Sequence, residues 1–168
     1  MKEITIRDVR DEDPKQIMEI FNHYVKNSYS AFPEVPLPVE MFGMFKQMTA
    51  GYPFLVASDG KDKVLGFGFL HPHNRIPTFK RTAEVTYFIH QEHRNQGIGS
   101  AILGILIGKG KEMGISNLLA SIASSNEESL RFHAKHGFKE VGRFEEVFRK
   151  KEKDVDVVWM QKVITVQK

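Results

Sequence analysis

TYFIHQEHRNQGIGSAILGILIG, residues 86–108, joins one apolar run to a longer one through a turn that contains Gly97 and Gly99. The first run is typical of a strand, and the second repeats its apolar residues at helical spacing, so the turn lies at a helix N-terminus. The N–H groups of a first helical turn lack helical partners and attract anions. Because glycine leaves room for an anion beside the backbone, the stretch predicts a phosphate-binding turn between a strand and a helix.

Two common phosphate-binding motifs do not match this turn. The P-loop has four residues between its first glycine and Gly-Lys-Ser/Thr. Residues 104–110 (GILIGKG) supply only three and no hydroxyl. The dinucleotide fingerprint has a glycine where Ile102 stands here and belongs to a parallel sheet. A strand-to-helix turn in which glycine serves only the backbone conformation is the simpler alternative.

Outward from the turn, the apolar pattern predicts a single α/β domain over residues 1–168, with a mixed sheet of about seven strands and flanking helices. Asp11, Glu12 and Asp13 precede Pro14, which predicts an acid-capped helix start there. The expected order is βααβββαβαββ. The expected strands are 4–10, 52–58, 64–70, 82–89, 118–122, 141–148 and 155–163, and the later helices are 39–48, 98–113 and 126–136.

Composition narrows the class of protein. Hydrophobic residues make up 41% and charged residues 27% of the 168 residues, as in a globular domain. The net charge of +3 is too small an excess to indicate nucleic-acid binding. The lack of cysteine excludes disulfides and thiolate metal sites. No apolar run reaches the roughly 18 residues of a membrane helix, and the charged start does not resemble a signal peptide. We expect a cytoplasmic protein.

Two segments of the chain resemble a known family. Arg94-Asn-Gln-Gly97-Ile-Gly99 resembles the [Q/R]-x-x-G-x-[G/A] loop of the GNAT acetyltransferases, and residues 126–138 resemble their later N-x-x-[A/S]…G-F segment. Within that superfamily the chain is most similar to the phosphinothricin, or L-amino acid, N-acetyltransferases. The likeness covers nearly the whole chain. It rests on YPFLVAS (52–58), TAEVTYFIHQEHRNQGIG (82–99), SNEESLRFHAKHGF (125–138) and DVVWMQ (156–161), together with IRDVRDED near the start.

The resemblance implies an acetyl-CoA-dependent N-acetyltransferase that acts on a small amino acid or analogue and forms a homodimer. It also implies that backbone groups of residues 87–89 lie along the thioester arm of acetyl-CoA and that the glycine turn holds its pyrophosphate. The residues expected to bind acetyl-CoA are Tyr87, Phe88, Ile89, Arg94, Asn95, Gln96, Gly97, Ile98, Gly99, Ser100 and Asn126.

Acetyl transfer to an alkyl amine requires a base, because the amine is mostly protonated at pH 7. Glu84 stands in an otherwise apolar strand, where a buried carboxylic acid would have a raised pKa. The resemblance places the proposed catalytic base at this position. Glu84 is therefore our candidate general base. The alternatives are an acid on a solvated strand face or a member of a structural ion pair.

His133 stands where most of the superfamily has a tyrosine that protonates the CoA thiolate, although the amino-acid branch often has histidine there. We expect His133 to contact the sulfur region or to relay protons. The alternative is a half-exposed histidine on a helix. His71-Pro-His73 and His90-x-x-His93 suggest a metal site, but without cysteine or an added carboxylate at ligand spacing we expect none.

Basic residues precede the strand that carries Glu84. Arg75, Lys80 and Arg81 suit a substrate carboxylate. Phe32 and Phe79 are candidates for apolar walls of the acceptor pocket, so the expected substrate-binding residues are Phe32, Arg75, Phe79 and Lys80. The chain departs from the family here, with Phe79-Lys80 for tyrosine-arginine, Asn74 for arginine and Asp154 for tryptophan. The run RKKEKD (149–154) is interpreted as a solvated hairpin tip.

Two other functions are consistent with the same residues. A GNAT enzyme that modifies a protein or peptide amine needs an open groove, which the proline-rich segment 28–38 would restrict. A non-catalytic CoA-binding regulator needs the glycine turn but has no use for Glu84 or His133 as proton-handling groups.

Overall fold

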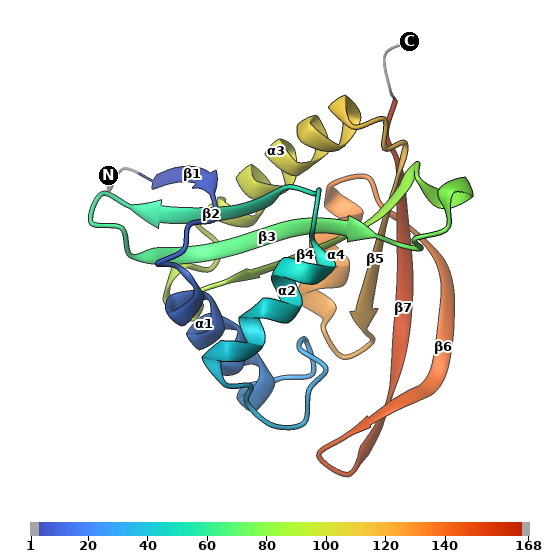
Figure 1. The fold of residues 1–168 in the computed structure, drawn as a ribbon. Helices are drawn as coiled ribbons and strands as arrows, with labels where there is room; N and C mark the ends of the chain where they lie inside the picture. The colour runs from blue at the N-terminus through green and yellow to red at the C-terminus, as the bar shows by residue number, and fades with distance from the viewer. Residues whose placement is uncertain (1–3, 166–168) are drawn as a thin grey trace.

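The computed structural model describes residues 4–165, and within them seven strands form one mixed sheet in the order β1-β2-β3-β4-β5-β7-β6 (Figure 1). Neighbouring strands pair antiparallel except β4 and β5, which are parallel. The predicted fold class is confirmed, while residues 1–3 and 166–168 of the predicted domain lie outside the described part. The strands are β1 (Ile4–Asp8), β2 (Phe54–Asp59), β3 (Val64–Pro72), β4 (Thr82–Ile89), β5 (Asn117–Ala123), β6 (Lys139–Lys150) and β7 (Lys153–Val163).

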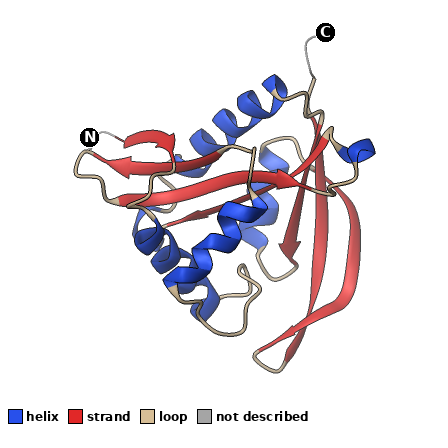
Figure 2. Ribbon diagram, in the orientation of Figure 1, coloured by secondary structure: helices blue, strands red, loops and turns tan. Residues whose placement is uncertain are grey.

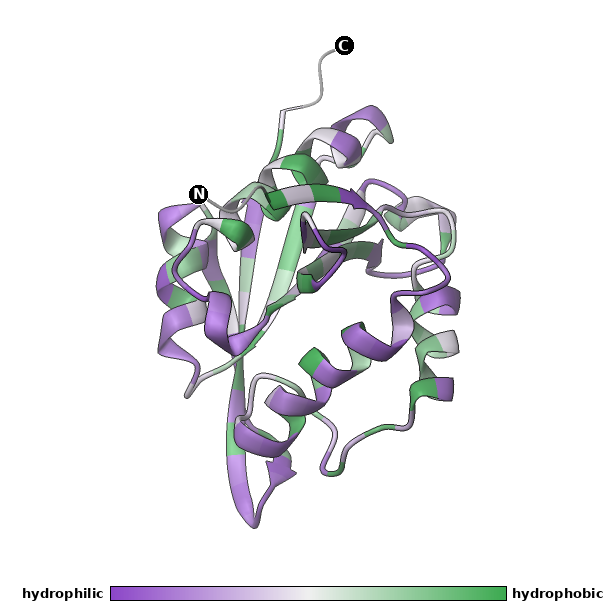
Figure 3. Ribbon diagram, turned by 90° about the vertical axis from the view of Figure 1, so that its left-hand side faces the viewer, coloured by the Kyte–Doolittle hydropathy of each residue, from purple (hydrophilic) through white to green (hydrophobic). Residues whose placement is uncertain are grey.

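Helices cover both faces of the sheet (Figure 2). Helix α1 (Pro14–Asn27) and helix α2 (Phe42–Met48) pack on one face, in a core that includes Phe54, Phe67 and Phe69. Helix α3 (Ile98–Glu112) buries Ile102 and Leu106 against the other face. Helix α4 (Glu127–Lys135) contributes to that second core through Leu130 and Phe132. Strands β2 and β3 are therefore buried on both sides over most of their length, and the outer helices show polar faces (Figure 3).

Close packing of α3 on the sheet depends on Gly68 in β3. A Cβ atom at this position would lie 2.7 Å from Cγ2 of Ile102, which is well below the van der Waals contact distance of two carbon atoms. Because glycine has no Cβ, α3 approaches the sheet closely enough to place its first turn beside the end of β4.

Three local expectations need correction. The predicted helix 39–48 begins as a 3-10 turn, Val39–Met41, and becomes α-helical at Phe42. Asp13 stands at the N-cap of α1, but its carboxylate does not cap the helix. It binds the guanidinium of Arg7 at 2.7 and 2.9 Å, because a buried carboxylate is stabilised by a charged partner. The last two strands are longer than predicted and meet in a tight turn at Lys151 and Glu152, both with positive φ.

No helix among residues 4–165 combines the length and apolar character that crossing a membrane requires.

Candidate active site

The sheet divides between β4 and β5, and a groove of about 1030 Å³ opens at the division. The two strands pair at only three positions, and the last pair is Glu84 with Leu119. Beyond that pair, residues 85–89 of β4 and 120–123 of β5 line the groove. A strand that has lost its neighbour presents backbone donors and acceptors along its edge. The division therefore gives the groove a polar backbone wall from β4.

The glycine turn forms one end of this groove, at the N-terminus of α3. Gly97 has a φ of 80°, a left-handed conformation that glycine adopts without strain. Its carbonyl accepts the N–H of Ala101 at 3.0 Å, which is the first hydrogen bond of the helix. The N–H groups of residues 98–100 precede that bond and lie at the positive end of the helix dipole. The turn thus has the chemistry of an anion site.

Most residues predicted to bind acetyl-CoA line this groove. Gln96 does not, and its side chain donates instead to the carbonyl of Glu92 at 3.3 Å. The predicted residues found in the lining are Tyr87, Phe88, Ile89, Arg94, Asn95, Gly97, Ile98, Gly99, Ser100 and Asn126.

Among these residues, Arg94 and Asn126 have side-chain partners on or beside α4. The guanidinium of Arg94 forms an ion pair with the carboxylate of Glu128 on α4. Asn126 caps α4, since its Oδ1 accepts the N–H of Ser129 at 3.2 Å, and its Nδ2 donates to Oγ of Ser30 at 2.9 Å. The ion pair holds Arg94 beside α4 at the groove, and Asn126 fixes the loop after α1 against α4.

Glu84 lies at the division of the sheet, one residue before the groove lining begins. Its side chain is 19% exposed, so the expectation of a buried acid in an apolar strand is wrong. Nδ1 of His73 lies 2.8 Å from Oε1 of Glu84, and Nε2 of His71 lies 3.6 Å from Oε2. The cause is the antiparallel register of β3 and β4, which places His71 directly opposite Glu84. The carboxylate thus has polar partners that its own strand does not reveal.

Three residues near Glu84 were not predicted to belong to its site, namely His71, His73 and Trp159. The His73 ring centroid lies 6.0 Å from that of Trp159 in β7 and 6.1 Å from that of Phe79. The two histidines could have been found from the pairing register of β3 with β4, which sets His71 opposite Glu84. Trp159 reaches the site from a strand more than seventy residues away in sequence, and local patterns contain no such signal.

His133 is 3% exposed, which contradicts the half-exposed alternative. Its Nδ1–H donates to the carbonyl of Ser129 at 2.7 Å, so that Nε2 accepts a hydrogen bond from the hydroxyl of Tyr87. Burial lowers the pKa of His133 to about 4 and raises the pKa of Tyr87 well above its usual value. At neutral pH the imidazole is therefore neutral, and it has no additional proton to give to a thiolate.

The buried neutral imidazole makes stability depend on pH. The unfolded chain protonates His133 below about pH 6.5, whereas the folded chain does so only near a pKa of about 4. We therefore expect this one group to lower the free energy of unfolding by about 2 kcal/mol between pH 7 and pH 5. Urea unfolding at both pH values measures the change. His133→Asn should remove this part of the decrease, and His23→Asn should retain it. An identical decrease in wild type and His133→Asn would contradict the assignment.

The structure separates the predicted substrate-binding residues. Phe32 lines the groove, and its ring lies 5.1 Å from that of Phe148. Phe79 is outside the lining but reaches the Glu84 region through its contact with His73. The Arg75 guanidinium donates to the carbonyl of Gln47 at 3.2 Å, and both Arg75 and Lys80 are exposed outside the groove lining.

The interpretation of residues 149–154 as a solvated tip is wrong at Lys150, which is 1% exposed. Its Nζ donates to the carbonyls of Ser28 and Ala31 at 2.8 and 2.7 Å. Burial lowers the pKa of Lys150. Because β6 and β7 are longer than predicted, their hairpin reaches the loop after α1 and holds the segment that carries Phe32.

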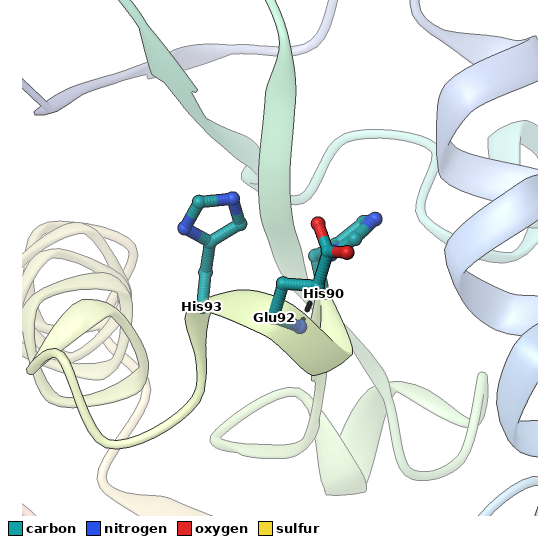
Figure 4. A group of neighbouring side chains, drawn as sticks. All are labelled: His90, Glu92 and His93. Carbon is teal, nitrogen blue, oxygen red and sulfur yellow. Dashed lines mark hydrogen bonds and ion pairs between the residues drawn. The ribbon is translucent and has the colours of Figure 1, made fainter.

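His90, Glu92 and His93 have potential metal-ligand atoms within 4.8 Å of one another (Figure 4). Nδ1 of His90 accepts the N–H of Glu92 at 3.3 Å, and the Glu92 carboxylate lies 3.8 Å from Nζ of Lys63. The Nδ1 lone pair of His90 is therefore already used, and Glu92 is a carboxylate between the two histidines that the expectation of no metal overlooked. The hydrogen bond from Glu92 to His90 closes the turn that leads to Arg94.

Comparison with known proteins agrees with this geometry. Residues 17–138 match the Acetyltransferase (GNAT) family. The chain is 30% identical to an L-methionine sulfoximine/L-methionine sulfone acetyltransferase of Pseudomonas paraeruginosa, over 94% of this chain and 92% of that protein. A phosphinothricin acetyltransferase from Sinorhizobium meliloti, crystallised with AcCoA, superposes with a TM-score of 0.89 at 28% identity, covering 96% of this chain and 88% of that one.

A ribosomal-protein-alanine N-acetyltransferase from Brucella melitensis also superposes, with a TM-score of 0.88 at 26% identity over 95% of this chain and 99% of that one. The fold is therefore shared by proteins named for different acceptors. The matched segment contains α3, the glycine turn, Glu84 and His133. The chain belongs to the GNAT acetyltransferase family and is an N-acetyltransferase that uses acetyl-CoA.

Proposed function

We propose that the enzyme is cytoplasmic and acetylates the primary amine of a small amino acid or analogue, such as phosphinothricin, methionine sulfone or methionine sulfoximine. The observation that carries the proposal is the continuity of one groove. It extends from the first-turn amides of α3 to the residue beside Glu84. An anion site at one end and a carboxylate at the other match a phosphorylated acetyl donor and a protonated amine.

The residues at the α3 end fit acetyl-CoA. Left-handed Gly97 turns the chain so that the amides of residues 98–100 begin the helix at the groove. These amides hold the pyrophosphate in our proposal, and the backbone of residues 87–89 along the groove, where the carbonyl of Ile89 already accepts the Tyr24 hydroxyl, holds the pantetheine arm. Acetyl-CoA supplies an acetyl group that is already activated as a thioester.

Glu84 is the general base in this proposal. The substrate ammonium must lose a proton before its nitrogen can attack the thioester carbonyl, and Glu84 is the carboxylate at the division of the sheet. Neutral His133 accepts the hydrogen bond from the Tyr87 hydroxyl, so it orients that hydroxyl at the groove wall. The catalytic role that the sequence suggested for His133 thus becomes a positioning role.

A substrate carboxylate is the feature that separates an amino acid from other amines. Esterification of methionine sulfone is expected to raise KM by at least about 30-fold, because breaking a desolvated ion pair costs several kcal/mol. Steady-state kinetics with the free acid and its methyl ester measure this effect. An unchanged KM would show that no cation holds the carboxylate.

The basic residues of the loop before β4 are then tested singly with Arg75→Met, Lys80→Met and Arg81→Met. One of the three is expected to reproduce the effect of the ester, and the other two should have little effect because exposed pairs contribute about 1 kcal/mol or less. Arg75 is the least favoured, since its guanidinium already contacts Gln47.

A protein or peptide amine is the main alternative acceptor, and the relative from Brucella melitensis is named for one. Such an acceptor requires an open groove. Here Lys150 holds the segment of residues 28–31 by two hydrogen bonds, and the following Phe32 lines the groove. A fixed wall of this kind favours a small acceptor.

We also propose that the enzyme is a homodimer. Strand β6 forms an edge of the sheet and exposes Val141, Phe144 and Val147, each by more than half. Exposed apolar side chains on an edge strand are suited to burial by a second chain. Light scattering is expected to give twice the mass of the 19.3 kDa chain, and Phe144→Asp should shift the mass toward that of a monomer. A wild-type mass of a single chain would contradict the dimer.

A further inference from the structure

His73 is the closest polar partner of the proposed base. Its Nδ1 lies 2.8 Å from Oε1 of Glu84, while His71 lies 3.6 Å from the other carboxylate oxygen. The two histidines thus contact different oxygens of one carboxylate. His73 comes just after β3, and its side chain is 33% exposed, compared with 15% for His71. His73 therefore has contact with both the carboxylate and the solvent.

The overall reaction requires a path for a proton from the Glu84 carboxylate to the solvent, because each turnover releases one proton. An ammonium substrate and the thioester give an amide and a thiol, and one proton remains in excess. If Glu84 keeps that proton, the next substrate finds no base. The proton must therefore pass from the division of the sheet to water in every turnover at neutral pH.

We propose that His73 relays this proton from Glu84 to solvent, an inference that rests on the proposed function of Glu84. The ammonium N–H bond breaks as an O–H bond forms on Glu84. The carboxylic acid then gives its proton to the His73 imidazole, which restores the carboxylate. The imidazolium loses one of its N–H protons to bulk water and becomes neutral again.

The surroundings of His73 favour this relay. The rings of Phe79 and Trp159 pack against the His73 ring and hold the imidazole in place. Neither of these two side chains carries a charge. Among residues 4–165, the titratable side chain paired with His73 is Glu84 from β4, and His71 from β3 contacts the other oxygen of the same carboxylate. The backbone N–H of His73 donates to the backbone carbonyl of Thr82 at 3.4 Å, which ties the residue to the start of β4.

The relay is tested with His73→Phe, His73→Gln and His73→Ala. Both Phe and Gln variants are expected to lower kcat at pH 7 by about tenfold or more, which is less than the loss of the base itself, and to leave the Kd of acetyl-CoA unchanged. The deficit should disappear at a pH above the pKa of the substrate amine, since no excess proton then has to leave. Added imidazole should partly restore His73→Ala. His23→Gln, on α1, serves as the matched histidine control and should behave as wild type.

The outcomes separate the relay from the base. Wild-type kcat in His73→Gln, or a deficit that is constant across pH, would reduce His73 to a hydrogen-bonding or structural role and overturn the relay. A silent His73→Phe together with an inactive Glu84→Gln would overturn the relay and leave the base intact. Wild-type activity in both would overturn the two proposals together.

Discussion

Replacement of Glu84 by glutamine is expected to lower kcat by about 100- to 10,000-fold at neutral pH, the usual loss when a general base is removed. Glutamine has the same shape, and its side chain can still hydrogen-bond to His73, so the fold and the Kd of acetyl-CoA should be unchanged. The rate should recover as the pH rises toward the pKa of the substrate amine, because an unprotonated amine needs no base.

Measurement of kcat from pH 6 to pH 10 tests this expectation, and calorimetry with acetyl-CoA checks that binding is intact. Lys80 is not a suitable position for a control substitution, because it is one of the proposed substrate-binding residues. Lys109→Gln, on α3 away from the groove lining, is expected to follow wild type over the whole range. An equal rate for wild type and Glu84→Gln at every pH would assign Glu84 to an ion pair that serves structure.

The second large effect is expected for Gly99→Glu, which should weaken acetyl-CoA binding at least about 100-fold, or about 2.7 kcal/mol. A Cβ atom at residue 99 would lie 3.5 Å from the Phe132 ring and 3.9 Å from Cγ1 of Ile89, both ordinary contacts. The added carboxylate would then occupy the groove beside the first-turn amides and repel a pyrophosphate. The fold should remain intact, because an acid is favourable near a helix N-terminus.

Gly99→Ala is the matched control for this change. Its methyl group fits the same contacts and adds no charge, so the affinity should stay within about threefold of wild type. Isothermal titration calorimetry with CoA measures both variants, and thermal unfolding checks the fold. Undiminished affinity in a folded Gly99→Glu protein would exclude the α3 turn as the pyrophosphate site.

The parts of the site that sequence could predict are local. The turn at Gly97, the start of α3 and the helix expected from residue 126 each follow from a few adjacent residues, and the structure has all three, with Asn126 as the N-cap of α4. Their chemistry is fixed within one helical turn, so that tertiary structure has little opportunity to alter it.

The parts that sequence could not predict depend on contacts between distant segments. Glu84 reads as a lone acid in an apolar strand until β3 brings two histidines beside it. Lys150 reads as a solvated cation until the hairpin of β6 and β7 buries it against carbonyls 119 and 122 residues earlier in the chain. In both cases polar burial is determined by strand register and strand length, which the local apolar pattern does not fix.

The most direct test of the account is CoA thiol release from acetyl-CoA with a panel of amines at pH 7. The chain contains no cysteine, so a thiol reagent reports only the product. The account predicts release with phosphinothricin or methionine sulfone, a kcat/KM at least about 30-fold lower with the corresponding methyl esters, and little release with spermidine or an alanyl peptide. Faster release with spermidine or the peptide than with any free amino acid would contradict the proposed function.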